Sequence, residues 1–123
     1  MKPQPAVVEY ALDILSVFGP IQARSMFGGW GLYHDGLMFG LIVDETIYLK
    51  TDDHNRPDFE AMDAHPFEYE TKSGKTAVMP YHEIPASVQE DRDALRVWCQ
   101  RSYEAALRSK QPAPAKKSRA RKT

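Results

Sequence analysis

The spacing of apolar residues begins with a helical repeat near the start of the chain. From Val8 to Phe18, apolar side chains recur at intervals of three or four residues, which is typical of an amphipathic helix. Pro5 suits the entrance of such a helix, and the Gly19-Pro20 pair ends the repeat. The pattern therefore predicts a first helix with one apolar face.

Beyond this helix the pattern changes to alternating or continuous apolar runs separated by turn residues, which predicts strands. Asp35-Gly36 is a strong signal for a β-hairpin, and Asp44-Glu45 provides the next reversal. Strands joined by such short connections are antiparallel. The three strands are expected at 24–33, 37–43 and 46–51.

The next segment combines a short helix with a second hairpin. Residues 52–63 offer Asp53 or Asn55 as a helix cap before a pair of apolar residues three apart. Residues 66–81 alternate aromatic and acidic side chains, and they reverse direction around Gly74. The hairpin is therefore expected to have one face in water.

The last element is a long helix that begins at a predicted capping box, with Ser87 as cap and Glu90 three residues later. Its apolar stripe consists of Leu95, Trp98, Cys99, Ser102, Tyr103 and Ala106. We expect Trp98 and Cys99, at the centre of this stripe, to be buried against the strands. Together the elements predict an α+β fold, an antiparallel β-sheet of about five strands flanked by N-terminal and C-terminal helices.

Charge divides the chain into two parts. The 123 residues, 42% of them hydrophobic, suffice for one ordinary domain. All 17 acidic residues precede Lys110, whereas six of the 16 basic residues lie from Lys110 onward, which leaves −7 on residues 1–109 and +6 on residues 110–123. The second part has no aliphatic side chain larger than alanine and repels itself, so we predict a folded domain over 1–109 and a disordered basic tail over 110–123.

The sequence also carries few features of a membrane or secreted protein. No apolar run approaches the roughly 18 residues that a membrane span needs, and the first residues do not form a signal peptide. The single cysteine cannot form an internal disulfide, which fits a reducing compartment. We therefore expect a cytoplasmic protein with no membrane partner.

Residue types that carry chemistry are scattered rather than grouped. The four histidines and Cys99 lack the short recurrent spacing of metal ligands, so no metal or cofactor is predicted. Cys99 lies in an apolar stripe, where burial makes a thiol inert. The adjacent carboxylates Asp52 and Asp53 suit a helix cap better than acid–base catalysis. We therefore expect no enzymatic activity.

Residues 24–42 concentrate five glycines among large apolar side chains. Gly28, Gly29 and Gly31 lack side chains, so aromatic neighbours can lie over a bare backbone where strands bend or approach each other. A phosphate-binding glycine loop leads into a helix, whereas this stretch leads through a strand into a hairpin. The structural interpretation is therefore favoured.

Arg24 and several aromatic residues remain open to two interpretations. The guanidinium of Arg24 can pair with a carboxylate, stack on Phe27 or Trp30, or bind a ligand. Aromatic side chains either form an interaction surface with Arg24 or complete a small core. The residues of this possible surface are Arg24, Trp30, Tyr33, Tyr48 and Tyr81.

Residues 24–42, with three later segments, resemble the TfoX N-terminal domain family over roughly residues 7–108. The most specific motif positions are Arg24, Met26, Phe27, Gly28, Gly29, Gly31, Gly36 and Phe39. The resemblance implies a small α+β domain from bacterial regulators of competence, which act on transcription alongside a cyclic-AMP receptor protein. It implies no catalytic residues. The longer regulators add a C-terminal helical domain, where this sequence has its basic tail.

Three classes of function follow. The resemblance favours a regulatory module that binds a protein partner, with the transcription machinery as the candidate partner. A second class is weak, non-specific binding of nucleic acid through the tail, against which the acidic domain acts. Small-ligand binding at the glycine-rich hairpin ranks last. The cations that would contact phosphates are Lys116, Lys117, Arg119, Arg121 and Lys122.

Overall fold

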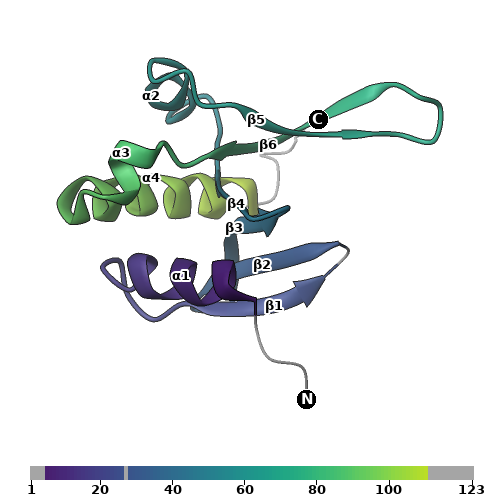
Figure 1. Ribbon diagram of the computed structural model, residues 1–123. Coiled ribbons are helices and arrows are strands. Elements are labelled where there is room, and N and C mark those ends of the chain that lie inside the picture. Colours follow the sequence, from purple (N-terminus) through teal and green to yellow (C-terminus); the bar gives the residue numbers. More distant parts are fainter. Residues whose placement is uncertain (1–4, 27, 111–123) are drawn as a thin grey trace, which may run out of the picture.

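A six-stranded antiparallel sheet and four helices form the fold in the computed structural model, which describes residues 5–26 and 28–110 (Figure 1). The strands are β1 (Gln22–Met26), β2 (Gly29–His34), β3 (Leu37–Val43), β4 (Thr46–Lys50), β5 (Pro66–Glu70) and β6 (Thr76–Glu83). The helices are α1 (Ala6–Leu15), α2 (Arg56–Glu60), α3 (Ala86–Gln89) and α4 (Arg92–Lys110). The strand order is β1-β2-β3-β4-β6-β5. The predicted α+β class is confirmed, with one strand more than expected.

The additional strand arises within the glycine-rich stretch, where the prediction of one strand over 24–33 is wrong. The chain reverses between Met26 and Gly29, and β1 pairs with β2 in register from Met26 opposite Gly29 to Gln22 opposite Tyr33. Gly28 lies in this reversal with a φ of +68°, a left-handed conformation that glycine adopts without strain. Because this reversal is short and lies inside a nearly continuous apolar run, it hardly changes the pattern of apolar residues. The pattern alone therefore does not reveal the turn.

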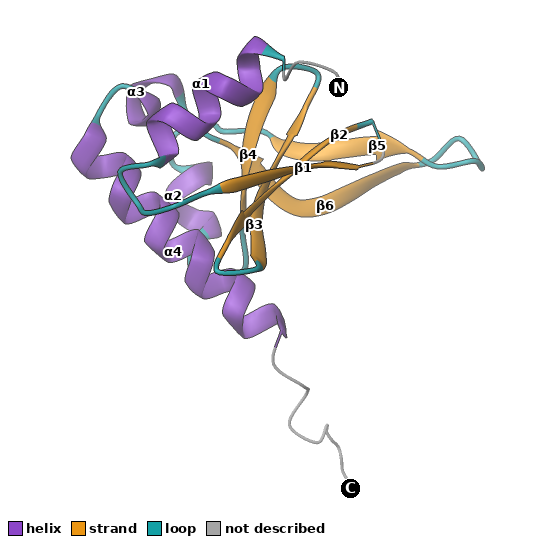
Figure 2. Ribbon diagram, turned by 90° about the horizontal axis from the view of Figure 1, so that it is seen from below, coloured by secondary structure: helices purple, strands orange, loops and turns teal. Residues whose placement is uncertain are grey.

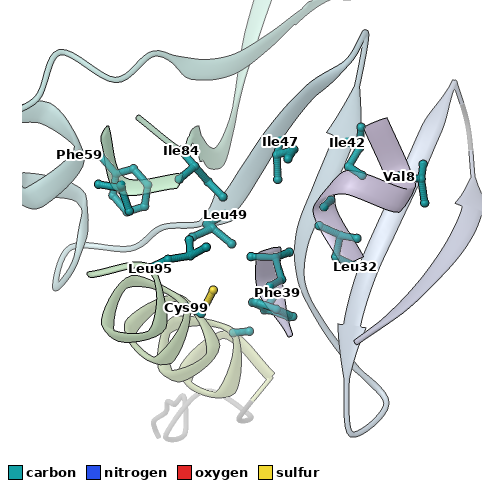
Figure 3. Close-up of a cluster of buried hydrophobic side chains, with 14 residues drawn as sticks. Val8, Leu32, Phe39, Ile42, Ile47, Leu49, Phe59, Ile84, Leu95 and Cys99 are labelled. Atoms are coloured by element: carbon teal, nitrogen blue, oxygen red, sulfur yellow. The ribbon is translucent and has the colours of Figure 1, made fainter. Parts of the chain in front are cut away.

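The helices lie together on one side of the sheet (Figure 2), and the core fills the space between them. Val8 of α1 and Cys99 of α4 are fully buried, as are Leu32 and Leu49 of the sheet. Figure 3 shows Cys99, Leu49 and Phe39 within this cluster. The predicted apolar stripe of the last helix therefore faces the sheet. Trp98 is only half-buried, and its ring meets that of Phe59 edge-on at 4.5 Å between centroids.

A bulge in β3 directs Phe39 into this core. Leu32 lies opposite Gly40 whereas Tyr33 lies opposite Met38, so Phe39 is an extra residue in β3. Its side chain is fully buried and meets one aromatic ring from the segment after α1 and one from α4. The ring partners of Phe39 are Phe18 at 5.6 Å and Tyr103 at 5.9 Å.

The predicted capping box at Ser87 is wrong, because the last helical region consists of two helices. Glu90 ends α3 instead of serving as the third residue of a long helix. Asp91 then begins α4, and its carboxylate accepts a hydrogen bond of 3.1 Å from the backbone N–H of Ala94. Ser87 and Asp91 are both suitable N-cap residues, and only Asp91 accepts a side-chain capping bond at the start of the long helix.

The polar residues before α2 also act differently from the prediction. Asn55 occupies the cap position of α2 but makes no side-chain capping bond. Its amide oxygen accepts a 2.8 Å hydrogen bond from the backbone N–H of Asp52, and its amide nitrogen donates to Ser102 Oγ at 3.3 Å. Asn55 and Ser102 are both buried, so this pair satisfies polar groups between α2 and α4.

Candidate interaction surface

The sheet face opposite the helices curls into a concave surface. Figure 1 shows the β1–β2 and β5–β6 hairpins projecting to the same side, with β3 and β4 between them. A hollow of about 180 Å³ on this face draws its lining from strands at both edges of the sheet, β1 and β5. Its lining residues are Met26, Gly29, Trp30, Met38, Leu41, Val43, Phe67, Met79 and Tyr81. We call this surface the concave face.

Register places further residues on the concave face. Arg24 lies opposite Gly31, which lies opposite Leu41, and Leu41 lies opposite Tyr48. Residues directly opposite each other in a sheet point to the same side. Arg24 and Tyr48 therefore share the side of Leu41, which lines the hollow.

Two glycines of β2 form the floor of the concave face. A Cβ on Gly29 would lie 2.2 Å from the backbone oxygen of Ile42, so no side chain fits without a shift of the strands. A Cβ on Gly31 would lie 2.9 Å from the sulfur of Met26 and 3.1 Å from that of Met38. The predicted close approach of an aromatic side chain over bare backbone therefore occurs, because the Tyr33 ring carbon Cε1 also lies 2.9 Å from that position, beside the two methionine sulfurs.

Arg24 stacks on an aromatic ring, but not on the ring that was predicted. Its guanidinium carbon lies 4.6 Å from the centroid of the Tyr33 ring, which is a cation–π geometry. Tyr33 was not among the stacking partners considered, since Trp30 and Phe27 are closer in sequence. The hairpin reversal places Arg24 beside β2, and Phe27 lies outside the described residues.

A second cation–aromatic pair lies on β4 and β6. Lys50 is opposite Tyr81, and its Nζ lies 5.2 Å from the centroid of that ring. Burial lowers the pKa of Lys50 from its ordinary value, although the nearby Asp52 opposes the shift. Burial raises the pKa of Tyr81, and the electrostatic effect of Tyr33 adds to it. Tyr33 and Tyr81 are therefore close enough on this face for one to affect the pKa of the other.

Four of the five predicted surface residues share the concave face by register, whereas Trp30 borders the hollow from the opposite side of the sheet. Trp30 lies opposite Ile42 and packs against the main core beneath the helices. Tyr33 and Tyr48 are half-buried, whereas Tyr81 is only 7% exposed. Trp30 therefore completes the core, whereas the other four residues lie on the concave face.

Sequence reasoning missed several residues of this surface. Lys50, Phe67 and Met79 were not considered, and Met26 was considered only as a motif position. The Phe67 ring lies 5.2 Å from that of Tyr48, so the β5–β6 hairpin meets β4 on this face. The alternation of residues along each strand indicates which side chains share one side of that strand. Only the order of strands in the sheet shows which of these side chains from different strands lie next to each other.

The remaining motif positions are structural. Gly36 has a φ of +78° in the turn between β2 and β3, as Gly28 does between β1 and β2. Phe39 lies in the core. The motif that carries the family resemblance thus specifies two hairpin turns, the glycine floor and a core aromatic.

Titratable groups of the described segments do not converge on one site. Within residues 5–26 and 28–110, no group of three or more His, Cys, Asp and Glu side chains is placed to hold a metal ion. Burial raises the pKa of the Cys99 thiol to about 12, which agrees with the expected packing role. Burial also lowers the pKa of His82, whose Nδ1 lies 3.0 Å from Thr51 Oγ1.

The tail prediction falls mostly outside the described residues, which end at Lys110 in α4. The five candidate phosphate-contacting cations, Lys116 to Lys122, all lie beyond that point. Among the helices that the structure describes, none combines the length and apolar character needed to cross a membrane.

Comparison with family models places this architecture among known proteins. The model of the TfoX N-terminal domain matches residues 13–106, a segment that begins in α1, ends in α4 and includes β1 to β6. A search of curated proteins finds no match to the chain. The resemblance drawn from residues 24–42 is therefore confirmed.

Proposed function

Because this chain belongs to the TfoX N-terminal domain family, we propose that it is a regulatory protein-interaction module whose concave face binds a partner protein. The resemblance to bacterial competence and transcription regulators supports a regulatory role, in the cytoplasm. The proposal includes no catalytic step.

The concave face itself carries the proposal. Residues of five strands line one hollow that no helix of the described chain covers. Met26 remains 40% exposed at its edge. Contiguous apolar surfaces of this kind mark binding sites, and flexible methionine side chains adapt to a partner's shape.

A comparison of substitutions on two exposed apolar residues tests the proposal. Met26→Asp places a carboxylate on the concave face, whereas the matched control Val97→Asp places one on α4, where Val97 is 53% exposed. Each variant is used as bait in the cell extract, and captured proteins are quantified by mass spectrometry. Thermal unfolding of both variants checks that they are folded.

We expect a partner that wild type and Val97→Asp capture equally and that Met26→Asp captures at least roughly tenfold less, because a buried unpaired charge opposes docking. Equal capture by all three proteins would contradict the proposal. Loss of capture by Val97→Asp alone would indicate that the partner binds α4 instead of the concave face.

The charge of the tail favours a second candidate, weak binding of nucleic acid. Residues 110–123 carry +6 and no aromatic residue, a composition suited to phosphate contacts without base recognition. This activity is compatible with the first, because it uses a different part of the chain.

A further inference from the structure

Two cations lie on the concave face on either side of Leu41 and its neighbours. Arg24 lies on edge strand β1, and Lys50 lies on β4, three strands further across the sheet. Three strand spacings amount to roughly 14 Å on a flat sheet, and the curl of this sheet shortens that distance. Each cation lies over a tyrosine ring, with Lys50 half-buried and Arg24 exposed to solvent.

Neither cation has a carboxylate partner within 4.0 Å among the residues that the structure describes. Asp52 is the acidic group that acts on Lys50, but Asp52 is held by Arg108, whose Nε lies 2.6 Å from its Oδ2. Half-buried Lys50 and exposed Arg24 are therefore both able to pair with a carboxylate from outside the chain.

Two further acidic groups near this face form no ion pair with either cation in the part of the chain that the structure describes. Glu83 lies opposite Tyr48, and its Oε1 is 2.9 Å from Nδ1 of His65. Asp44 lies in the turn between β3 and β4. The concave face therefore presents an apolar hollow with positive charge at Arg24 and Lys50, although residues 1–109 carry −7 overall.

We propose that the segment bound by the concave face is an apolar protein segment with at least two carboxylate side chains, which pair with Arg24 and Lys50. This inference rests on the proposed function and names the chemistry of its partner. Apolar side chains of the segment fill the hollow between Met26, Met38 and Met79, and the carboxylates fix its position.

A protein segment fits these observations better than a single-stranded nucleic acid. Nucleic-acid binding needs ring faces free for base stacking. Here Arg24 lies over the Tyr33 ring, Lys50 lies over the Tyr81 ring, and the Phe67 ring is stacked with that of Tyr69. Pairing with carboxylates retains both cation–aromatic contacts.

Selection from a displayed library of random 12-residue peptides tests the proposal on the full chain. The test variant combines Arg24→Gln with Lys50→Gln. The matched control combines Arg92→Gln with Arg96→Gln, which removes two positive charges from exposed positions on α4. A charge-conserving variant, Arg24→Lys with Lys50→Arg, separates loss of charge from loss of shape. Met26→Asp shows which peptides depend on the concave face, and thermal unfolding monitors each variant.

We expect wild type, the α4 control and the charge-conserving variant to enrich apolar peptides that contain Asp or Glu. The test variant should lose the acidic preference and bind an enriched peptide about tenfold more weakly. Changing the peptide's Glu to Gln should weaken binding to wild type by a similar factor and leave binding to the test variant unchanged.

The alternative outcomes separate the two proposals. Enrichment of apolar peptides without Asp or Glu, or equal acidic preference in the test variant, would overturn the carboxylate inference and leave the docking surface intact. Absence of any peptide whose binding Met26→Asp abolishes would overturn the proposed function itself. If a labelled single-stranded oligonucleotide loses more affinity for the test variant than for the α4 control, the concave face is a nucleic-acid site.

Discussion

The two faces of the sheet are formed by the same strands but differ in how deeply their side chains are buried. On the face beneath the helices, Leu32, Leu49 and Phe39 are completely buried. On the concave face, Met26 is 40% exposed and Tyr33 and Tyr48 are half-buried. Both faces are rich in apolar side chains, so apolar character alone does not distinguish a core from a surface.

The difference lies in side-chain type and charge. The covered face holds mostly branched aliphatic side chains and phenylalanine, which have few conformations and pack into one fixed arrangement. The concave face combines methionines with tyrosines, Arg24 and Lys50, which are flexible or polar at their ends. This composition suits a surface that meets water in one state and a partner in another.

The largest difference between the faces should appear in stability. Leu49→Ala removes a completely buried side chain beneath α4 and should lower the free energy of unfolding by about 2–5 kcal/mol. Met26→Ala on the concave face should change it by less than about 1 kcal/mol. Urea unfolding followed by circular dichroism measures both. Comparable losses would show that the concave face is part of the folding core.

The glycine floor gives a smaller and more local comparison. Gly29→Ala forces a Cβ against the backbone oxygen of Ile42, which cannot move alone, and should destabilise by about 1–3 kcal/mol. Gly31→Ala meets the ends of Met26, Met38 and Tyr33, which can rotate away, and should lower stability by about 1 kcal/mol or less. Thermal melts of the two variants test the order. The reverse order would show that the methionines are held rigidly.

The attachment of α4 to the covered side should show a still smaller, pH-dependent effect. The hydrogen bond from Arg108 lowers the pKa of Asp52, so the ionised carboxylate stabilises the fold. That stabilisation is present above the unfolded-state pKa of about 4 and is lost as the pH falls through the lower folded-state value. Because both side chains are partly exposed, Arg108→Gln should lower stability at pH 7 by only about 0.5–1 kcal/mol.

Urea unfolding of wild type and Arg108→Gln between pH 7 and pH 2 checks this prediction. The difference between the two proteins should shrink as Asp52 is protonated. A difference that stays constant down to the lowest pH would assign the effect of Arg108 to packing instead of charge.

The weakest expected effect is DNA binding by the tail, which should not depend on the concave face. The full chain should bind duplex DNA non-specifically, with a Kd roughly in the range of 10⁻⁴ to 10⁻⁶ M, and the affinity should fall steeply with salt. Deletion of residues 111–123 should abolish this binding, whereas Met26→Asp should leave it unchanged. Fluorescence titration with two unrelated sequences at two salt concentrations measures both effects. Tight, sequence-selective binding by the shortened chain would identify the domain itself as a DNA-binding domain.

Local patterns predicted most elements because their signals lie within a few residues. The repeat from Val8 to Phe18 gave α1, and Asp35-Gly36 gave the turn between β2 and β3. Predictions were wrong where the same residues are compatible with two local structures. The chain reverses at Gly28 inside an apolar run, and Asp91 instead of Ser87 caps the last helix. At Gly28 the pairing of β1 with β2 fixes the reversal, and at Asp91 a turn between α3 and α4 fixes the cap.

By itself, the sequence determined the α+β class, the family motif and the apolar stripe that buries Cys99, because these depend on residue type and spacing. Only the tertiary structure decided which residues share the concave face. The order β1-β2-β3-β4-β6-β5 and the curl of the sheet bring Met26 and Phe67 to one hollow from opposite edges. It also separated Trp30 from the tyrosines, because a residue's side of a sheet depends on its pairing with neighbouring strands.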